Sequence, residues 1–207
     1  FGWKIDDDSN VTKVSAFMVN EEKIGVYQNC GKKDWWADKL PANVTIYPTI
    51  NELKNSDSKG YLIITDEIVD DNSLLQNAVV YRPPSLVVGV GLHWDTAKGT
   101  IKDGLMSCMN KFKLSEKSIA RFVSIKKEND VAGLVELAKE MSKPIQHFEK
   151  EELASISTPN PSKTVQTFEG TPSVSEAAAI KSSEGKLVVE KQKFPPNLTI
   201  AIARIPN

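Results

Sequence analysis

Short runs of apolar and β-branched residues, separated by polar turns, occupy the first third of the chain. Four of these runs predict strands, at residues 14–19, 23–27, 43–47 and 61–65. The polar residues 20–22 separate the first two runs, so we expect a hairpin there. A short helix is predicted from Thr49 to Lys54, and residues 55–60 have the composition of a loop. This pattern indicates a small α/β unit.

The hydrophobic pattern changes at Arg82-Pro83-Pro84-Ser85. Two adjacent prolines cannot complete a strand ladder, and they favour an extended connection. We therefore predict a domain boundary here, with one domain at 1–84 and a second at 85–207. The run that follows, from Leu86 to Gly91, is apolar apart from its glycines. Such a run is typical of a strand covered on both faces, as in a parallel sheet.

Strands alternate with helices in the second part of the chain. Ile101, Leu105 and Met109 recur at helical spacing, and they predict a helix from Thr96 or Thr100 to Phe112. A second helix is predicted from an Asp130 N-cap to Met141. Its expected inward-facing residues are Val131, Leu134, Val135 and Ala138. Further strands are predicted at 121–125, 144–148, 186–190 and 198–204, and a short helix at 150–155.

Ser173-Val174-Ser175-Glu176 has the sequence of a capping box, and it should open an alanine-rich helix that ends at Gly185. The complete pattern predicts an α/β fold class. We expect a small α/β domain followed by a three-layer α/β/α domain.

Composition excludes several classes of protein. Hydrophobic residues make up 40% of the 207 residues and charged residues 26%, as in ordinary globular chains. The 26 basic and 27 acidic residues give a net charge of −1, which argues against a nucleic-acid-binding protein. No apolar run approaches the roughly 20 residues that a membrane span needs. Cys30 and Cys108 are too few for a disulfide framework, so we expect a reducing, cytoplasmic compartment and no protein-bound metal.

The loop predicted at 89–96, which begins with the last glycines of the apolar run at 86–91, could carry chemistry. Gly89 and Gly91 would allow a ligand to approach the backbone, and the helix that follows would offer free N–H groups to an anion. His93 can act as an acid or a base, and Trp94 can stack on a flat ligand. Ordinary packing is the alternative for both side chains. Trp94 occupies the third glycine position of a dinucleotide fingerprint, so nucleotide binding is not favoured.

Three other segments are candidates for ligand binding. The first is the proline-containing turn at 158–162, where a plain structural turn is the alternative. The second is the loop from Gly170 to Ser173, which leads into the capped start of the alanine-rich helix. The third is a lysine pair expected between two strands, where a solvated face is the alternative. The candidate residues are Asn160, Ser162, Thr171, Ser173, Lys191 and Lys193. In the first domain, the Trp35-Trp36 pair is either an aromatic plug beneath the sheet or a contact face for a partner or ligand.

Six segments in order resemble the C-terminal domain of the cobalamin-biosynthesis protein family CbiG, which the CobE proteins share. These segments are Leu86–Gly91, Ser124–Leu134, Pro159–Ser162, Gly170–Ala179, Leu187–Lys191 and Thr199–Arg204. The resemblance covers residues 85–207. Residues 1–84, which end in Val80-Tyr81-Arg82-Pro83-Pro84, look like the middle region of CbiG, and CobE proteins lack that region.

The resemblance implies hydrolysis of cobalt-precorrin-5A in anaerobic vitamin B12 biosynthesis. In that reaction a δ-lactone on the macrocycle opens, acetaldehyde leaves and cobalt-precorrin-5B forms. The substrate carries the cobalt, so no cofactor is expected. With this substrate, the candidate residues above would bind carboxylates and the ring, and His93 or Glu176 would serve as the base.

Two alternatives stay open beside the hydrolase. One is a tetrapyrrole-binding accessory module without catalysis, and the other is a nucleotide-binding domain that uses Gly89 and Gly91. The chain begins at Phe1 rather than Met, so we expect a fragment or a processed chain. Contact with an N-terminal domain of the family is then expected, and a homodimer is left open.

Overall fold

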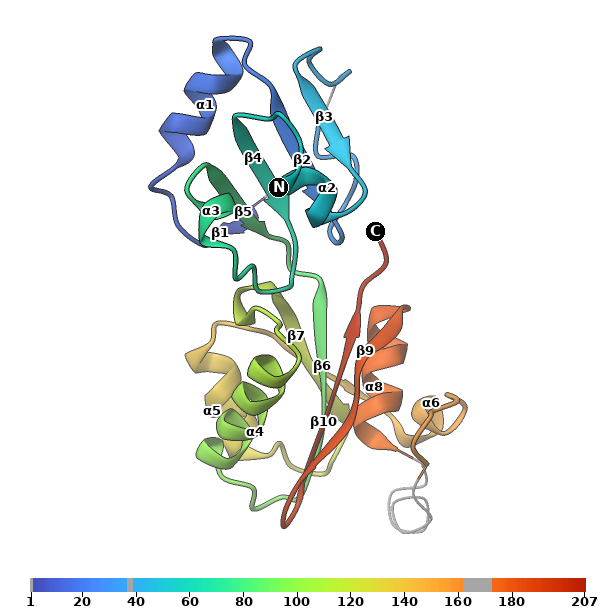
Figure 1. Cartoon of the computed structure of the whole chain (residues 1–207). Coiled ribbons are helices and arrows are strands. Elements are labelled where there is room, and N and C mark those ends of the chain that lie inside the picture. The colour runs from blue at the N-terminus through green and yellow to red at the C-terminus, as the bar shows by residue number, and fades with distance from the viewer. Residues whose placement is uncertain (1, 37–38, 162–172) are drawn as a thin grey trace. The chain divides into compact units, whose positions relative to one another are not determined.

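The computed structural model of the chain describes residues 2–36, 39–161 and 173–207 (Figure 1). The chain divides into two compact units. The first unit is Phe1–Pro84 together with Asn207, and the second is Ser85–Pro206. Each unit has a five-stranded sheet with helices on its faces, so the predicted α/β class is confirmed.

The first unit is a mostly parallel sheet with the strand order β1-β5-β4-β2-β3. Strands β2, β3, β4 and β5 run parallel to one another, and β1 pairs antiparallel with β5. The strands are β1 (Lys4–Ile5), β2 (Ile24–Gln28), β3 (Val44–Tyr47), β4 (Gly60–Ile64) and β5 (Ala78–Arg82). The helices are α1 (Val11–Val19), α2 (Ile50–Lys54) and α3 (Asn72–Leu75). Helix α1 packs on one face, and α2 and α3 pack on the other.

The strand predicted at 14–19 is wrong, because these residues belong to helix α1. Val11, Val14 and Met18 recur at helical spacing, and all three pack against the sheet in one apolar cluster. The expected hairpin is also wrong, since β2 is flanked on both sides by parallel partners, β3 and β4. The predictions for β2, β3, β4 and α2 are confirmed. Thr49 caps α2, where its hydroxyl oxygen accepts from Glu52 N at 3.1 Å.

The second unit has the strand order β8-β7-β6-β10-β9. Strands β6, β7 and β8 are parallel, and β10 pairs antiparallel with both β6 and β9. The strands are β6 (Leu86–Leu92), β7 (Ile119–Ile125), β8 (Ile145–Phe148), β9 (Lys186–Phe194) and β10 (Leu198–Arg204). The helices are α4 (Lys98–Lys111), η1 (Glu116–Ser118), α5 (Ala132–Glu140), α6 (Lys150–Ala154) and α8 (Val174–Ser183).

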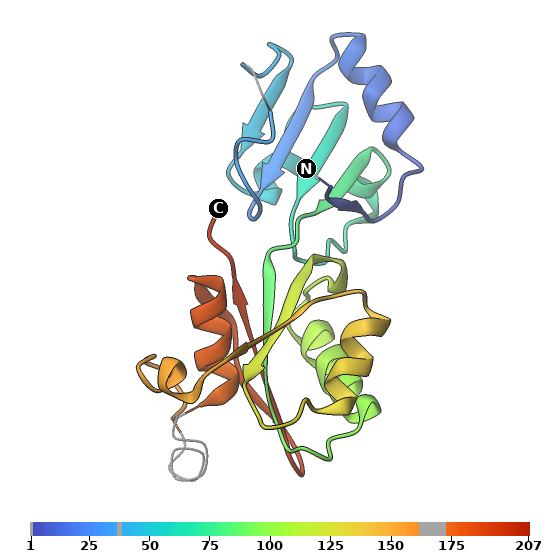
Figure 2. The ribbon, with the colours of Figure 1, turned by 180° about the vertical axis from the view of Figure 1, so that it is seen from behind.

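This sheet is the middle of three layers. Helices α4 and α5 lie on one face and α6 and α8 on the other, as Figure 2 also shows from behind. The predicted stripe of α4 is confirmed, since Ile101, Leu105 and Met109 are buried. Two details of α5 are wrong. Val131 rather than Asp130 is the N-cap, and Val135 is 40% exposed because it lies at the edge of the buried stripe.

Candidate functional site

The carboxyl ends of the parallel strands β6, β7 and β8 meet at one edge of the second sheet, which we call the carboxyl-end edge. Ligands bind beyond such edges in open α/β sheets. Helix α8 begins at the same edge, because a Cβ atom on Gly91 near the end of β6 would lie 3.5 Å from Val174 Cβ. In Figure 1 this edge is the lower end of the second unit.

Gly89 and Gly91 lie inside strand β6 and not in a loop, so that prediction is wrong. A Cβ atom on Gly89 would sit 1.9 Å from the Ser175 carbonyl oxygen, and one on Gly91 would sit 2.4 Å from Thr199 Oγ1. Helix α8 and strand β10 therefore occupy the space that the missing side chains leave. These two glycines allow close packing of a helix on the strand rather than close approach of a ligand.

His93 and Trp94 follow β6 directly and project from the carboxyl-end edge. Trp94 is 71% exposed, so it is not a core residue. His93 Nδ1 lies 2.7 Å from Asp95 Oδ1. An aspartate in this position accepts from Nδ1–H and leaves Nε2 as the acceptor of the neutral ring. The loop itself is held because Thr96 Oγ1 donates to the His93 carbonyl at 2.9 Å.

Glu176 does not complete a capping box, so this prediction is wrong. Ser173 is the N-cap of α8, but its side chain makes no capping hydrogen bond. The Glu176 side chain points instead to Asn160. Its Oε1 accepts from Asn160 Nδ2 at 2.8 Å and from Lys191 N at 3.0 Å, and its Oε2 accepts from Asn160 N at 3.2 Å. The residue is fully buried, and both carboxylate oxygens have donors.

Lys191 and Lys193 lie within β9, not between two strands as predicted. Strand β9 advances three residues, from Val189 to Gln192, while β10 advances only two. The extra residue is a β-bulge, which bends the strand and takes a backbone group out of the ladder. The bulge explains why Lys191 N donates to the Glu176 carboxylate rather than to a carbonyl of β10.

The Lys191 side chain completes a network that we call the Asn160 cluster: Asn160, Glu176, Glu190 and Lys191. Lys191 Nζ donates to the Asn160 carbonyl, and Asn160 Nδ2 also donates to Glu190 Oε2 at 2.9 Å. Burial lowers the pKa of Lys191, Glu176 opposes this shift, and the charge of Lys193 adds to it. Asn160 is therefore fixed through its backbone and its side chain.

The structure thus brings together three of the predicted residues, Asn160, Glu176 and Lys191. Lys193 lies level with Gly91 across the sheet, because Thr199 of β10 is paired with Gly91 on one side and with Lys193 on the other. Ser162 and Thr171 lie outside the described residues. Sequence reasoning missed Asp95, although its position two residues after His93 was a visible signal. It also missed Glu190, which no local pattern marks.

The described residues contain no group of three or more His, Cys, Asp or Glu side chains that could hold a metal ion. In the same parts of the chain, no helix has the length and apolar character needed to cross a membrane.

Comparison with known proteins matches both units. Residues 1–83 match the family described as cobalamin biosynthesis central region, and residues 86–203 match cobalamin synthesis G C-terminus. Cobalt-precorrin-5A hydrolase of Priestia megaterium is 34% identical over 210 residues, which cover 100% of this chain and 56% of that protein. The chain thus spans little more than half the length of this curated relative.

Two solved structures are similar in fold. CobE, a protein from the cobalamin biosynthetic pathway, has a TM-score of 0.56 and 24% identity, and the match covers 60% of this chain and 94% of CobE. A cobalamin biosynthesis protein G homologue from Sulfolobus solfataricus has a TM-score of 0.50 and 19% identity. That match covers 99% of this chain and 57% of the homologue.

Proposed function

Because the chain belongs to the cobalamin biosynthesis G family, CbiG, through both its central and its C-terminal regions, we propose that it acts in the hydrolysis of cobalt-precorrin-5A. The observation that carries this proposal is the 34% identity, over the whole chain, to a protein named for that reaction. The named relative is longer, so the proposal concerns the contribution of these 207 residues.

The reaction needs a base, stabilisation of an oxyanion and binding of a flat macrocycle that carries several carboxylates. Water adds to the lactone carbonyl and the ring C–O bond breaks, which gives a carboxyl group and an alcohol. The alcohol carbon leaves as acetaldehyde when its O–H proton is lost and the electrons of the broken C–C bond stay with the macrocycle. A base next to the water and N–H donors next to the carbonyl oxygen would lower both barriers.

We propose His93 as the base that activates water. Its ring is half exposed at the carboxyl-end edge, and Asp95 at 2.7 Å from Nδ1 leaves Nε2 to accept a proton. Glu176 is less suited to this role, because it is fully buried and its carboxylate already accepts three hydrogen bonds. We therefore propose Glu176 as a positioning residue, which holds Asn160 at the edge.

Two further predicted residues, Lys193 and Trp94, would bind the substrate. Lys193 is exposed and would pair with a carboxylate, and the exposed Trp94 ring offers a face for the macrocycle. The first N–H groups of α8 have no partners within the helix, and they would donate to the oxyanion that forms at the lactone carbonyl. Asn160 is only partly buried, and it would contact the substrate from the Asn160 cluster.

The test is anaerobic mixing of the chain with cobalt-precorrin-5A, with acetaldehyde release and the macrocycle's absorption spectrum followed together. We expect both signals from the wild-type chain. His93→Gln should lower kcat by about 100-fold or more, because the general base is lost, and leave substrate binding intact. His147→Gln is the matched control, since His147 is the chain's other histidine and has no proposed role.

Each outcome decides between the alternatives. A spectral shift without acetaldehyde supports the accessory binding module and overturns hydrolysis by this chain. The absence of both signals overturns the tetrapyrrole proposal for these residues. Equal losses of kcat in His93→Gln and His147→Gln would leave His93 without a catalytic role. A separate variant, Glu176→Gln, tests whether the Asn160 cluster affects KM or kcat.

A further inference from the structure

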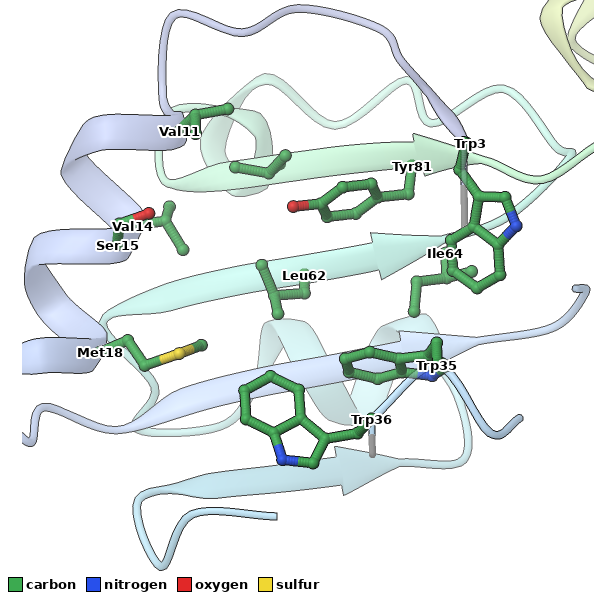
Figure 3. Close-up of a pocket in the computed structure, with 12 residues that line it drawn as sticks. Trp3, Val11, Val14, Ser15, Met18, Trp35, Trp36, Leu62, Ile64 and Tyr81 are labelled. Carbon is green, nitrogen blue, oxygen red and sulfur yellow. The ribbon is translucent and has the colours of Figure 1, made fainter. Parts of the chain in front are cut away.

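The first unit contains a pocket that the proposed reaction does not use. It lies on the face of the sheet that α1 covers, above β4 and β5, and its volume is about 420 Å³ (Figure 3). Four aromatic side chains form much of its wall: Trp3, Trp35, Trp36 and Tyr81. Trp35 also packs against the apolar core beneath it, but both rings line an open space, which favours the ligand-contact alternative for this pair.

The aromatic wall is held in place before any ligand binds. Gln28 lies at the end of β2, and its two Nε2–H groups are shared among the carbonyl oxygens of residues 30–32, at 3.0 to 3.1 Å. Its Oε1 accepts from Trp35 Nε1 at 2.7 Å. The Trp35 and Trp36 rings are perpendicular, at an interplanar angle of 89° and a centroid distance of 5.6 Å. A ligand therefore does not have to order this loop, which reduces the entropic cost of binding.

The lining residues, all within the described parts of the chain, include no charged side chain. A carboxylate or an ammonium group would lose its hydration here without gaining a partner, which is costly. Tyr81 supplies a neutral polar group, and Figure 3 shows its hydroxyl pointing toward α1. Among the described residues, this hydroxyl has no hydrogen-bond partner. Burial raises the pKa of Tyr81, so the phenol stays protonated and can donate.

The size of the pocket matches a small molecule better than a protein segment. Ligand pockets typically measure about 300–1,000 Å³. A single turn of α-helix, about 10 Å wide and 5.4 Å long, fills about 420 Å³. The pocket thus has room for one helical turn, which is far shorter than a helix that could dock stably.

We propose that this pocket binds an uncharged, planar ring compound that carries one hydrogen-bond acceptor. Its ring would lie on the apolar floor of Leu62 and Ile64 and contact the Trp35 and Trp36 rings. Its acceptor would take the Tyr81 hydroxyl proton in a hydrogen bond. This proposal is independent of the reaction proposed for the second unit, and it stands or fails separately.

The test uses the full chain and the neutral fluorescent ketone 6-propionyl-2-dimethylaminonaphthalene as the probe. We expect saturable binding of one probe per chain with a blue-shifted emission. Ser15→Phe places a ring in the pocket from the exposed surface of α1 and should weaken binding by about tenfold or more. Tyr81→Phe removes only the hydroxyl and should weaken binding by about three- to tenfold.

Two controls make the test specific. Trp94→Phe alters an exposed tryptophan of the second unit, so it should leave probe binding unchanged. The anionic probe 1-anilinonaphthalene-8-sulfonate should bind about tenfold more weakly than the ketone, because the pocket holds no cation. Each of three results would overturn the proposal. These are non-saturable binding of the ketone, a wild-type affinity for the ketone in both Ser15→Phe and Tyr81→Phe, and tighter binding of the sulfonate than of the ketone.

Discussion

Replacement of Gly89 by alanine tests the close contact between strand β6 and helix α8. The added Cβ atom would sit 1.9 Å from the Ser175 carbonyl oxygen and 3.0 Å from Ala179 Cβ. A carbon and a carbonyl oxygen need about 3.3 Å between them, so strand and helix must separate by about 1.4 Å. Helix α8 cannot move this far without leaving the sheet, because Ala177, Ala178 and Ala179 are fully buried against it.

The expected loss of unfolding free energy is about 2 kcal/mol, which is the upper end of the overpacking cost less the chain entropy returned. Overpacking of a well-packed core costs about 1–3 kcal/mol, and the contact here is with backbone, which cannot rotate away. The reduced chain entropy of the unfolded alanine variant returns about 0.4–1 kcal/mol of that cost. The same shift would move Glu176, the residue after Ser175, so substrate turnover should fall together with stability.

Urea denaturation measures this effect with an internal reference. Circular dichroism at 222 nm follows the helices of both units, most of which belong to the second. In a Trp94→Phe background, tryptophan fluorescence reports the first unit alone, through Trp3, Trp35 and Trp36. We expect the midpoint of the second unit to fall by about 1 M or more, with the fluorescence midpoint unchanged.

Gly99→Ala is the matched control, since no atom lies within 4 Å of its added Cβ in the first turn of α4. There alanine should stabilise the helix by about 0.5–1 kcal/mol. If Gly89→Ala keeps the wild-type midpoint, or if both variants change it equally, the close-packing role of Gly89 is refuted.

Three further predictions follow from buried and charged groups. Burial raises the pKa of Cys108 to about 11, so only about one thiol in 1,000 is ionised at pH 8, and Cys108 should react with a chromogenic disulfide only after unfolding. Two lysines of α4 lower the pKa of Glu140 from 4.5 to about 2, so its stabilisation is complete above pH 4.5 and is lost as the pH falls toward 2. Glu140→Gln should reduce the dependence of the thermal unfolding midpoint on pH across that window. A pH dependence equal to that of the wild type would contradict this. The side chain of Arg82 is fully buried, and it donates to Asp6 Oδ2 and to two carbonyl oxygens. Arg82→Ala should therefore lower the unfolding free energy of the first unit by about 3 kcal/mol or more, measured by tryptophan fluorescence. A loss below about 1 kcal/mol would show that these hydrogen bonds contribute little.

Much of the second unit could be predicted because its signals are local. The apolar run at 86–91 and the stripe of Ile101, Leu105 and Met109 encode burial directly in their spacing, and the structure places both in the core. The local signal is weaker in the first unit, since five of the six residues at 14–19 are apolar, and such a short run fits a strand as well as a helix. The parallel partners on both sides of β2 decide between them, and these partners are 20 and 36 residues along the chain from Ile24.

The sequence by itself determined the α/β class, most of the elements and the residue types at the site. Only the tertiary structure decided how those residues are used. Glu176 binds Asn160, 16 residues away, rather than its own helix terminus, because a bulge in β9 also turns Lys191 N toward it. The pocket in the first unit likewise requires Trp3, Trp35 and Tyr81 to meet over one sheet. Spacing along a chain encodes which face is buried, but hydrogen-bond partners and cavities depend on strand register and on contacts between distant segments.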